Sequence, residues 1–194
     1  MSDERMFIRQ VRSVSSDFKT RQDGEALKIE GYFAVFNSNY DIAPGMSESI
    51  APGAFKKWLA GGDIRALVNH DSTLVLGRTI AHTLELREDE YGLYGSIDIN
   101  PNDSDAMNLY ERVKRGDVSQ CSIGFDILSE ETDILENGDI HWTMTELKLW
   151  EVSCCTFPAY ESTNIDARSK ERDNILKREN DAWRAKMKER ISKC

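Results

Sequence analysis

The chain has 194 residues, of which 40% are hydrophobic and 30% charged, and its formal net charge is −9. This composition predicts a soluble globular protein, long enough for one domain with a core plus an appendage. No apolar run approaches the roughly 20 residues that a membrane-spanning helix needs. The polar N-terminus lacks the apolar region of a signal peptide, so we expect neither membrane insertion nor export.

Charge is unevenly spread along the chain. Residues 167–194 hold ten Lys/Arg and five Asp/Glu, a net charge of +5, which leaves −14 on the rest. An acidic body with a basic tail is not typical of a nucleic-acid-binding domain. Apolar residues among the tail's charges predict an amphipathic helix. We therefore predict a domain at 1–166 and a basic helical tail at 167–194, which either docks on an acidic partner or is simply solvated.

The cysteine pattern gives no sign of a metal site. Cys121, Cys154, Cys155 and Cys194 form no CxxC pair, and the chain has only three histidines, so zinc binding is not expected. No cofactor motif is evident either. Cys154 and Cys155 lie in an apolar stretch, and we interpret them as buried, reduced thiols.

Periodicity in the first half predicts strands with one short helix. Residues 6–14 have a strand-like composition, and apolar residues at 27, 29, 33 and 35 alternate with polar ones. Turn residues fill 37–46, which predicts a loop. A short helix is expected from Pro52 to the glycines at 61–62. The next strand should place Ile64, Ala66, Val68 and His70 on one face.

The second half predicts a hairpin, a helix and two further strand regions. Residues 80–86 and 93–99 alternate as a hairpin, with His82 on the apolar face of its first strand. Residues 101–115 have capping residues at the start, an apolar stripe and a glycine after the last turn, as a helix does. A strand follows at 121–127, then an acidic loop at 130–139 and a β-rich stretch at 143–157.

These elements predict a mainly β fold with inserted helices, of the α+β class. Alternating strands favour a small antiparallel sheet or barrel over a doubly wound fold. In the strand at 121–127, Ser122 faces away from Cys121, Ile123 and Phe125. A hydroxyl here, an imidazole at His70 and a carboxylate in the β-rich stretch are the components of a serine-nucleophile hydrolase.

Nine short motifs occur along residues 28–168. They are GYFAVFN (31–37), ESIAPGAF (48–55), NHD (69–71), LG (76–77), YGL (91–93), RGDV (115–118), CSIGF (121–125), LWEVS (149–153) and TFPAY (156–160). In this order they resemble the prohead serine proteases of tailed phages, a family related to the herpesvirus assemblins. One departure is Cys121, where the family commonly has Met; either residue is a soft apolar filler.

The resemblance implies a β-barrel wrapped by helices and a serine endopeptidase without a cofactor. Such an enzyme cleaves the scaffold segment and the major capsid protein, and often itself, inside the assembling prohead in the bacterial cytoplasm. It implies Ser122 as nucleophile and His70 as general base, with self-association as a further expectation. The alternative is a non-catalytic scaffold or assembly factor of the same fold. On an active enzyme, the tail would be a removable pro-segment or a scaffold-docking helix.

The third member of the triad is an acid in phage relatives and a second histidine in assemblins. Glu151 and Glu146 are five residues apart and face opposite sides of a regular strand. We favour Glu151, which lies among apolar neighbours in the matching segment, and keep Glu146 as the alternative. Of the histidine alternatives, we expect His82 in the core and His141 exposed near a turn.

Overall fold

The computed structural model describes residues 10–15, 18–23, 26–157 and 162–192. Contacts divide the chain into a body, Met1–Tyr160, and a second unit, Glu161–Cys194. The second unit contains helix α3 (Ser162–Ser192). A helix is therefore present where the basic tail was expected, whereas its amphipathic character and the domain boundary at residue 166 stay predictions.

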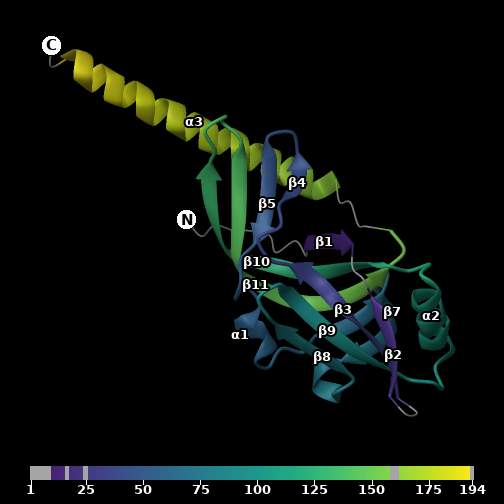
Figure 1. Ribbon diagram of the computed structural model, residues 1–194. Coiled ribbons are helices and arrows are strands. Elements are labelled where there is room, and N and C mark those ends of the chain that lie inside the picture. Colours follow the sequence, from purple (N-terminus) through teal and green to yellow (C-terminus); the bar gives the residue numbers. More distant parts are fainter. Residues whose placement is uncertain (1–9, 16–17, 24–25, 158–161, 193–194) are drawn as a thin grey trace. The chain divides into compact units, whose positions relative to one another are not determined.

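The described strands of the body form two sheets (Figure 1). The seven-stranded sheet contains β1 (Gln10–Ser15), β4 (Tyr40–Ala43), β5 (Met46–Ile50), β6 (Arg65–Val68), β7 (Asp71–Arg78), β10 (Gln120–Ile134) and β11 (Ile140–Cys155). The four-stranded sheet contains β2 (Lys19–Asp23), β3 (Ala26–Val35), β8 (Leu84–Glu88) and β9 (Gly92–Ile99). The helices of the body are α1 (Lys56–Leu59), α2 (Ser104–Arg115) and a 3-10 turn (Thr79–Ala81).

The mainly β, α+β architecture is confirmed, but its pairing is not purely antiparallel. The long strands β10 and β11 form an antiparallel hairpin, and β1 pairs with β10 on the edge opposite β11. On its other side β11 pairs in parallel with β5 and with β6. The described strands thus form a mixed sheet and a second, antiparallel sheet, not one closed antiparallel barrel. Likeness to assemblins in particular stays a prediction.

One apolar core is shared by the two sheets. Ile29 and Phe33 of β3 and Ile123 and Phe125 of β10 have no exposed surface and belong to one cluster of buried side chains. The strand alternation seen in the sequence is confirmed at these positions. Since Cys121 and Ile123 face the core, Ser122 between them faces the opposite side of the sheet.

Helix α2 agrees with its sequence signals. The Asp103 side chain accepts hydrogen bonds from the N–H groups of Asp105 and Ala106, which caps the first turn. Gly116 ends the helix with φ 89°, a left-handed conformation that glycine adopts without strain. The predicted apolar stripe is buried: Ala106, Leu109, Tyr110 and Val113.

Two predicted loops are partly strands. Residues 40–43 form β4, which pairs with β5, although turn residues surround them. Residues 130–134 continue β10 and pair with residues 140–144 of β11, so the acidic loop is limited to 135–139 around Gly138, which has φ 86°. In both cases the partner strand lies just across a short turn and supplies the hydrogen bonds that composition alone does not reveal.

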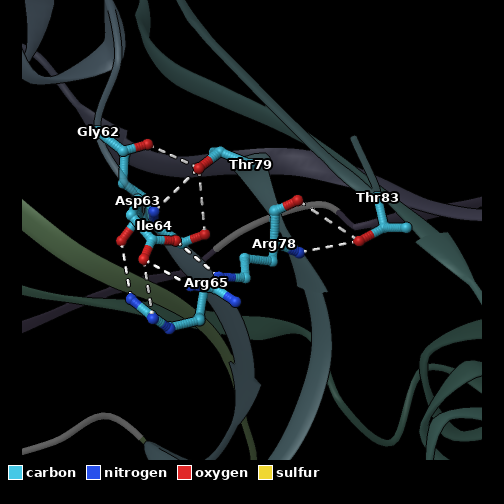
Figure 2. Close-up of polar contacts among 7 residues, drawn as sticks. All are labelled: Gly62, Asp63, Ile64, Arg65, Arg78, Thr79 and Thr83. Carbon is cyan, nitrogen blue, oxygen red and sulfur yellow. Dashed lines mark hydrogen bonds and ion pairs between the residues drawn. The ribbon is translucent and has the colours of Figure 1, made fainter. Parts of the chain in front are cut away.

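Polar contacts close the base of the β6–β7 hairpin (Figure 2). The Asp63 carboxylate lies between two guanidinium groups: Arg78 donates two hydrogen bonds of 2.7 Å to it, and Arg65 donates one of 2.9 Å. The bonds from Arg78 hold the pKa of Asp63 below its ordinary value. Beside them the Thr79 hydroxyl donates to the Gly62 carbonyl oxygen at 2.7 Å. These contacts fix the two strands whose far end carries His70.

Gly62→Ala should destabilise the body, because the new methyl group would lie 2.2 Å from the backbone carbonyl oxygen of Trp58. Gly61→Ala is the matched control, since a methyl group there meets no atom within 4 Å. Urea unfolding followed by circular dichroism should give a loss of about 1–3 kcal/mol for Gly62→Ala. The control should stay within about 0.5 kcal/mol of wild type; equal stability of the two variants would contradict the close packing at Gly62.

Candidate active site

His70 was expected on a strand, but it lies at the tip of a tight turn. Val68 and Asp71 pair with each other, so that only Asn69 and His70 connect β6 to β7. Both have positive φ, 49° and 62°, as in a type I′ hairpin turn. Asparagine tolerates this conformation, whereas histidine adopts it less readily. Contacts from the surrounding structure must therefore hold the turn.

Hydrogen bonds to β11 and the residue after it hold this turn. The Asn69 N–H donates to the Cys154 carbonyl oxygen at 3.0 Å, and the Asn69 side-chain oxygen accepts from the Thr156 N–H at 2.9 Å. The His70 N–H donates to the Ser153 hydroxyl at 3.2 Å. These hydrogen bonds fix the backbone of His70 independently of the contacts of its ring.

The imidazole ring is bonded to a buried carboxylate. His70 Nδ1 lies 2.7 Å from Glu151 Oε1, and the side chains are 22% and 2% exposed. The second carboxylate oxygen accepts from the Ser153 hydroxyl at 2.6 Å. Because a carboxylate oxygen only accepts, Nδ1 carries a proton in this contact, and in the neutral ring the lone pair is then on Nε2. Nε2 lies 3.7 Å from Cys155 Sγ.

Ser122 lies directly across the ladder from this group. It pairs with Ser153, the residue whose hydroxyl bonds both the His70 N–H and Glu151. Residues 151, 153 and 155 of β11 share the face toward which Ser122 is directed. Ser122 is fully buried, and its hydroxyl donates to the Arg12 carbonyl oxygen of β1 at 2.9 Å. Among the described residues, the Ser122 hydroxyl bonds to this carbonyl oxygen and not to His70.

The alternative acid lies elsewhere on β11. Glu146 pairs in the ladder with Ser129, and its carboxylate forms a 2.7 Å ion pair with Lys57. Cys121, the residue next to Ser122, is fully buried in the core cluster, and its Sγ lies 3.1 Å from the Tyr32 carbonyl oxygen. The described contacts therefore bring His70 to Glu151 rather than to Glu146.

The other two histidines differ from their predicted surroundings. His82 was expected in the core but is exposed, because it follows the 3-10 turn with φ 56° and does not lie on a strand. His141 was expected to be exposed but is partly buried on β11. Its ring nitrogens lie 2.8 Å from the hydroxyls of Ser47 and Ser49 on the adjacent strand β5.

Sequence reasoning missed the contribution of Ser153 and Cys155 to this site. Their alternation with Glu151 along one strand was the available signal. Burial, followed by the nearby charge of Glu151, raises the pKa of the Cys155 thiol to about 12. The thiol therefore stays protonated near neutral pH, and a protonated thiol is a poor nucleophile.

A cavity of about 400 Å³ opens beside Glu151. Its other lining residues come from β6, β7, β10 and β11: Arg65, Leu67, Ser72, Val75, Asp126 and Trp150. Among the residues described, no cluster of three or more His, Cys, Asp or Glu side chains is arranged to hold a metal ion. None of the described helices has the length and apolar character to cross a membrane.

Comparisons with known proteins found a matching family, a similar relative and a similar solved structure. The model of the family described as Caudovirus prohead serine protease matches residues 15–178. The prohead protease of Enterobacteria phage HK97 is 33% identical over 163 residues, which cover 81% of this chain and 68% of that protein. The solved structure of the bacteriophage T4 capsid assembly protease aligns with a TM-score of 0.43 at 12% identity, over 75% of this chain and 98% of that one.

Iodoacetamide should fail to modify Cys155 in the folded protein at pH 8. With a pKa of about 12, only about one thiol in ten thousand is ionised at this pH, and the side chain is 1% exposed. Mass spectrometry after digestion should find Cys155 unmodified in the native protein, and fully alkylated when the same reaction is run in denaturing urea. Rapid alkylation of the native protein would instead indicate a thiolate paired with His70.

Proposed function

The chain belongs to the Caudovirus prohead serine protease family, and from this premise we propose that it is a serine endopeptidase with Ser122, His70 and Glu151 as its catalytic triad. It is a protease of phage capsid maturation. The observation that carries the triad assignment is the 2.7 Å contact between His70 and the buried Glu151 on the sheet face shared with Ser122.

Glu151 holds the imidazole in the form that catalysis needs. With the ring proton on Nδ1, Nε2 can take the proton of a hydroxyl, and the buried carboxylate then stabilises the imidazolium. The Ser153 hydroxyl supports this arrangement twice, since it donates to Glu151 and accepts from the His70 N–H. Ser153 is thus a positioning residue for the base.

Reaction requires Ser122 to exchange one hydrogen bond for another. Its hydroxyl must leave the Arg12 carbonyl oxygen and donate to His70 Nε2, which now lies next to Cys155 Sγ. The oxygen then attacks the peptide carbonyl, His70 passes the proton to the leaving amine, and water hydrolyses the acyl-enzyme. The described arrangement is therefore a resting one, in which the base and its acid are already assembled.

The substrates are the scaffold segment and the major capsid protein, and the site of action is the interior of the prohead in the host cytoplasm. The basic unit from residue 161 onward contributes separately, either as a pro-segment removed by cleavage or as a docking helix for scaffold. Its net positive charge, opposite to that of the body, supports a role in which it recognises an acidic surface. Intact mass after incubation distinguishes removal from retention.

Ser122→Ala should abolish cleavage of a co-expressed scaffold–capsid fusion while leaving the circular dichroism spectrum unchanged. Glu151→Gln should lower kcat/KM by about 100-fold or more, because the neutral amide cannot stabilise the imidazolium and can favour the wrong tautomer. Cleavage is followed by gel electrophoresis and mass spectrometry of the products.

Glu146→Gln is the matched control, since Glu146 lies on the same strand as Glu151 but its carboxylate pairs with Lys57. It should keep activity within about twofold of wild type, because an exposed ion pair contributes little. Undiminished cleavage by Ser122→Ala would refute the nucleophile assignment. A loss with Glu146→Gln rather than with Glu151→Gln would move the acid to Glu146, and a wild-type chain that cuts nothing would favour the non-catalytic assembly factor.

A further inference from the structure

Strand β1 occupies the place next to Ser122 that an extended substrate would take. It is an edge strand, antiparallel to β10, and Ser13 lies opposite Ser122 in the ladder. The Ser122 hydroxyl donates to the Arg12 carbonyl oxygen at 2.9 Å, and that carbonyl belongs to the Arg12–Ser13 peptide bond. Extended peptides commonly bind by adding a strand to a sheet edge. Because Ser122 is fully buried, an incoming peptide must displace β1.

The side chain of Arg12 lies in a pocket with a buried acid at its end. Its guanidinium forms an ion pair with Glu48, which has no exposed surface, while Arg12 itself is 8% exposed. Aromatic rings flank the cation: the Tyr40 ring centroid lies 5.7 Å and that of Phe125 5.9 Å from the guanidinium carbon. These are favourable surroundings for a cation removed from water.

The pocket has spare room beside this pair. A cavity of about 140 Å³ adjoins Arg12 and Glu48, and its other lining residues come from β3, β4, β5, β10 and β11 and from the loop before β4. A carboxylate buried at this depth requires a cationic partner. A neutral side chain in place of Arg12 would lose this ion pair with Glu48, and an acidic one would be repelled by the carboxylate.

We propose that Glu48 and this cavity form the specificity pocket for a basic side chain of the substrate, and that β1 occupies it in the resting protein. The proposal rests on Ser122 being the nucleophile. The substrate class is an extended segment with Arg or Lys immediately before the cleaved bond. Hydrolysis breaks the C–N bond after that residue, and one water molecule supplies the new carboxylate and amine. Arg12 and Ser13 remain joined while the Ser122 hydroxyl donates its hydrogen bond to the Arg12 carbonyl oxygen and not to His70.

Quenched fluorogenic peptides containing the β1 sequence QVRSVS test the pocket on the full chain. The peptide with Arg at the position of Arg12, and the one with Lys there, should be cut between the positions that match Arg12 and Ser13. Counterparts with Gln or Glu at that position should show kcat/KM lower by at least about tenfold. Equal cleavage of all four peptides would overturn the proposal.

The double variant Arg12→Glu/Glu48→Arg keeps an internal ion pair with its charges reversed, and it should now prefer the Glu peptide. Asp98→Asn, which removes a surface partner of Lys28 on the other sheet, is the control and should leave the preference for Arg unchanged. A folded double variant that still prefers Arg would show that the Arg12–Glu48 pair only stabilises the fold.

Arg12→Gln provides a second measurement, because it weakens the hold on β1 and leaves Glu48 in place. A fluorophosphonate probe should label Ser122 at least about tenfold faster in this variant than in wild type, as expected if losing a buried charge pair frees the strand. Labelling of Ser122 with no effect of peptide charge would reject the pocket and leave the proposed function intact. Absence of both labelling and peptide cleavage in every variant would reject the serine mechanism and the pocket with it.

Discussion

The hydrogen bond between His70 and Glu151 is the contact on which the site depends, and most of the surrounding structure serves to maintain it. A buried carboxylate is tolerated only when its oxygens are bonded, and here the imidazole and the Ser153 hydroxyl bond one oxygen each. The imidazole reaches it from a turn with two left-handed residues, which is held by the polar base of the hairpin around Asp63 and by hydrogen bonds to β11. Fold and site are therefore linked through the same strand.

The β10–β11 hairpin decides which residues can act together. Antiparallel pairing sets Ser122 opposite Ser153, and alternation turns both away from the core. The same alternation directs Cys121 into the core, so that the thiol next to the nucleophile candidate is separated from the imidazole. The parallel pairing of β11 with β6 completes the arrangement, because it brings the turn that carries His70 to this face.

Strand β1 has two roles in this description. It completes the edge of the seven-stranded sheet, and its Arg12 contributes the carbonyl that accepts from Ser122 and the cation that neutralises Glu48. An edge strand can be exchanged more easily than a central one, since only one neighbour must release it. With Ser122 as the proposed nucleophile, burial under such a strand would keep the protease inactive until a competing peptide displaces the strand.

Local features were predictable from the sequence because neighbouring residues determine them. The caps and apolar stripe of helix α2, the β8–β9 hairpin and the glycine turn at 138 all follow from short-range periodicity and backbone preference. The nine ordered motifs identified the family, and the apolar setting of Glu151 favoured it over Glu146. Long-range pairing decided the rest. Only the fold could reveal that His70 lies in a turn rather than on a strand and that β11 pairs in parallel with β5 and β6. Only the fold, too, shows that the carbonyl oxygen of Arg12 accepts a hydrogen bond from Ser122, over a hundred residues away. The physical reason is that no local pattern records which distant strands become neighbours.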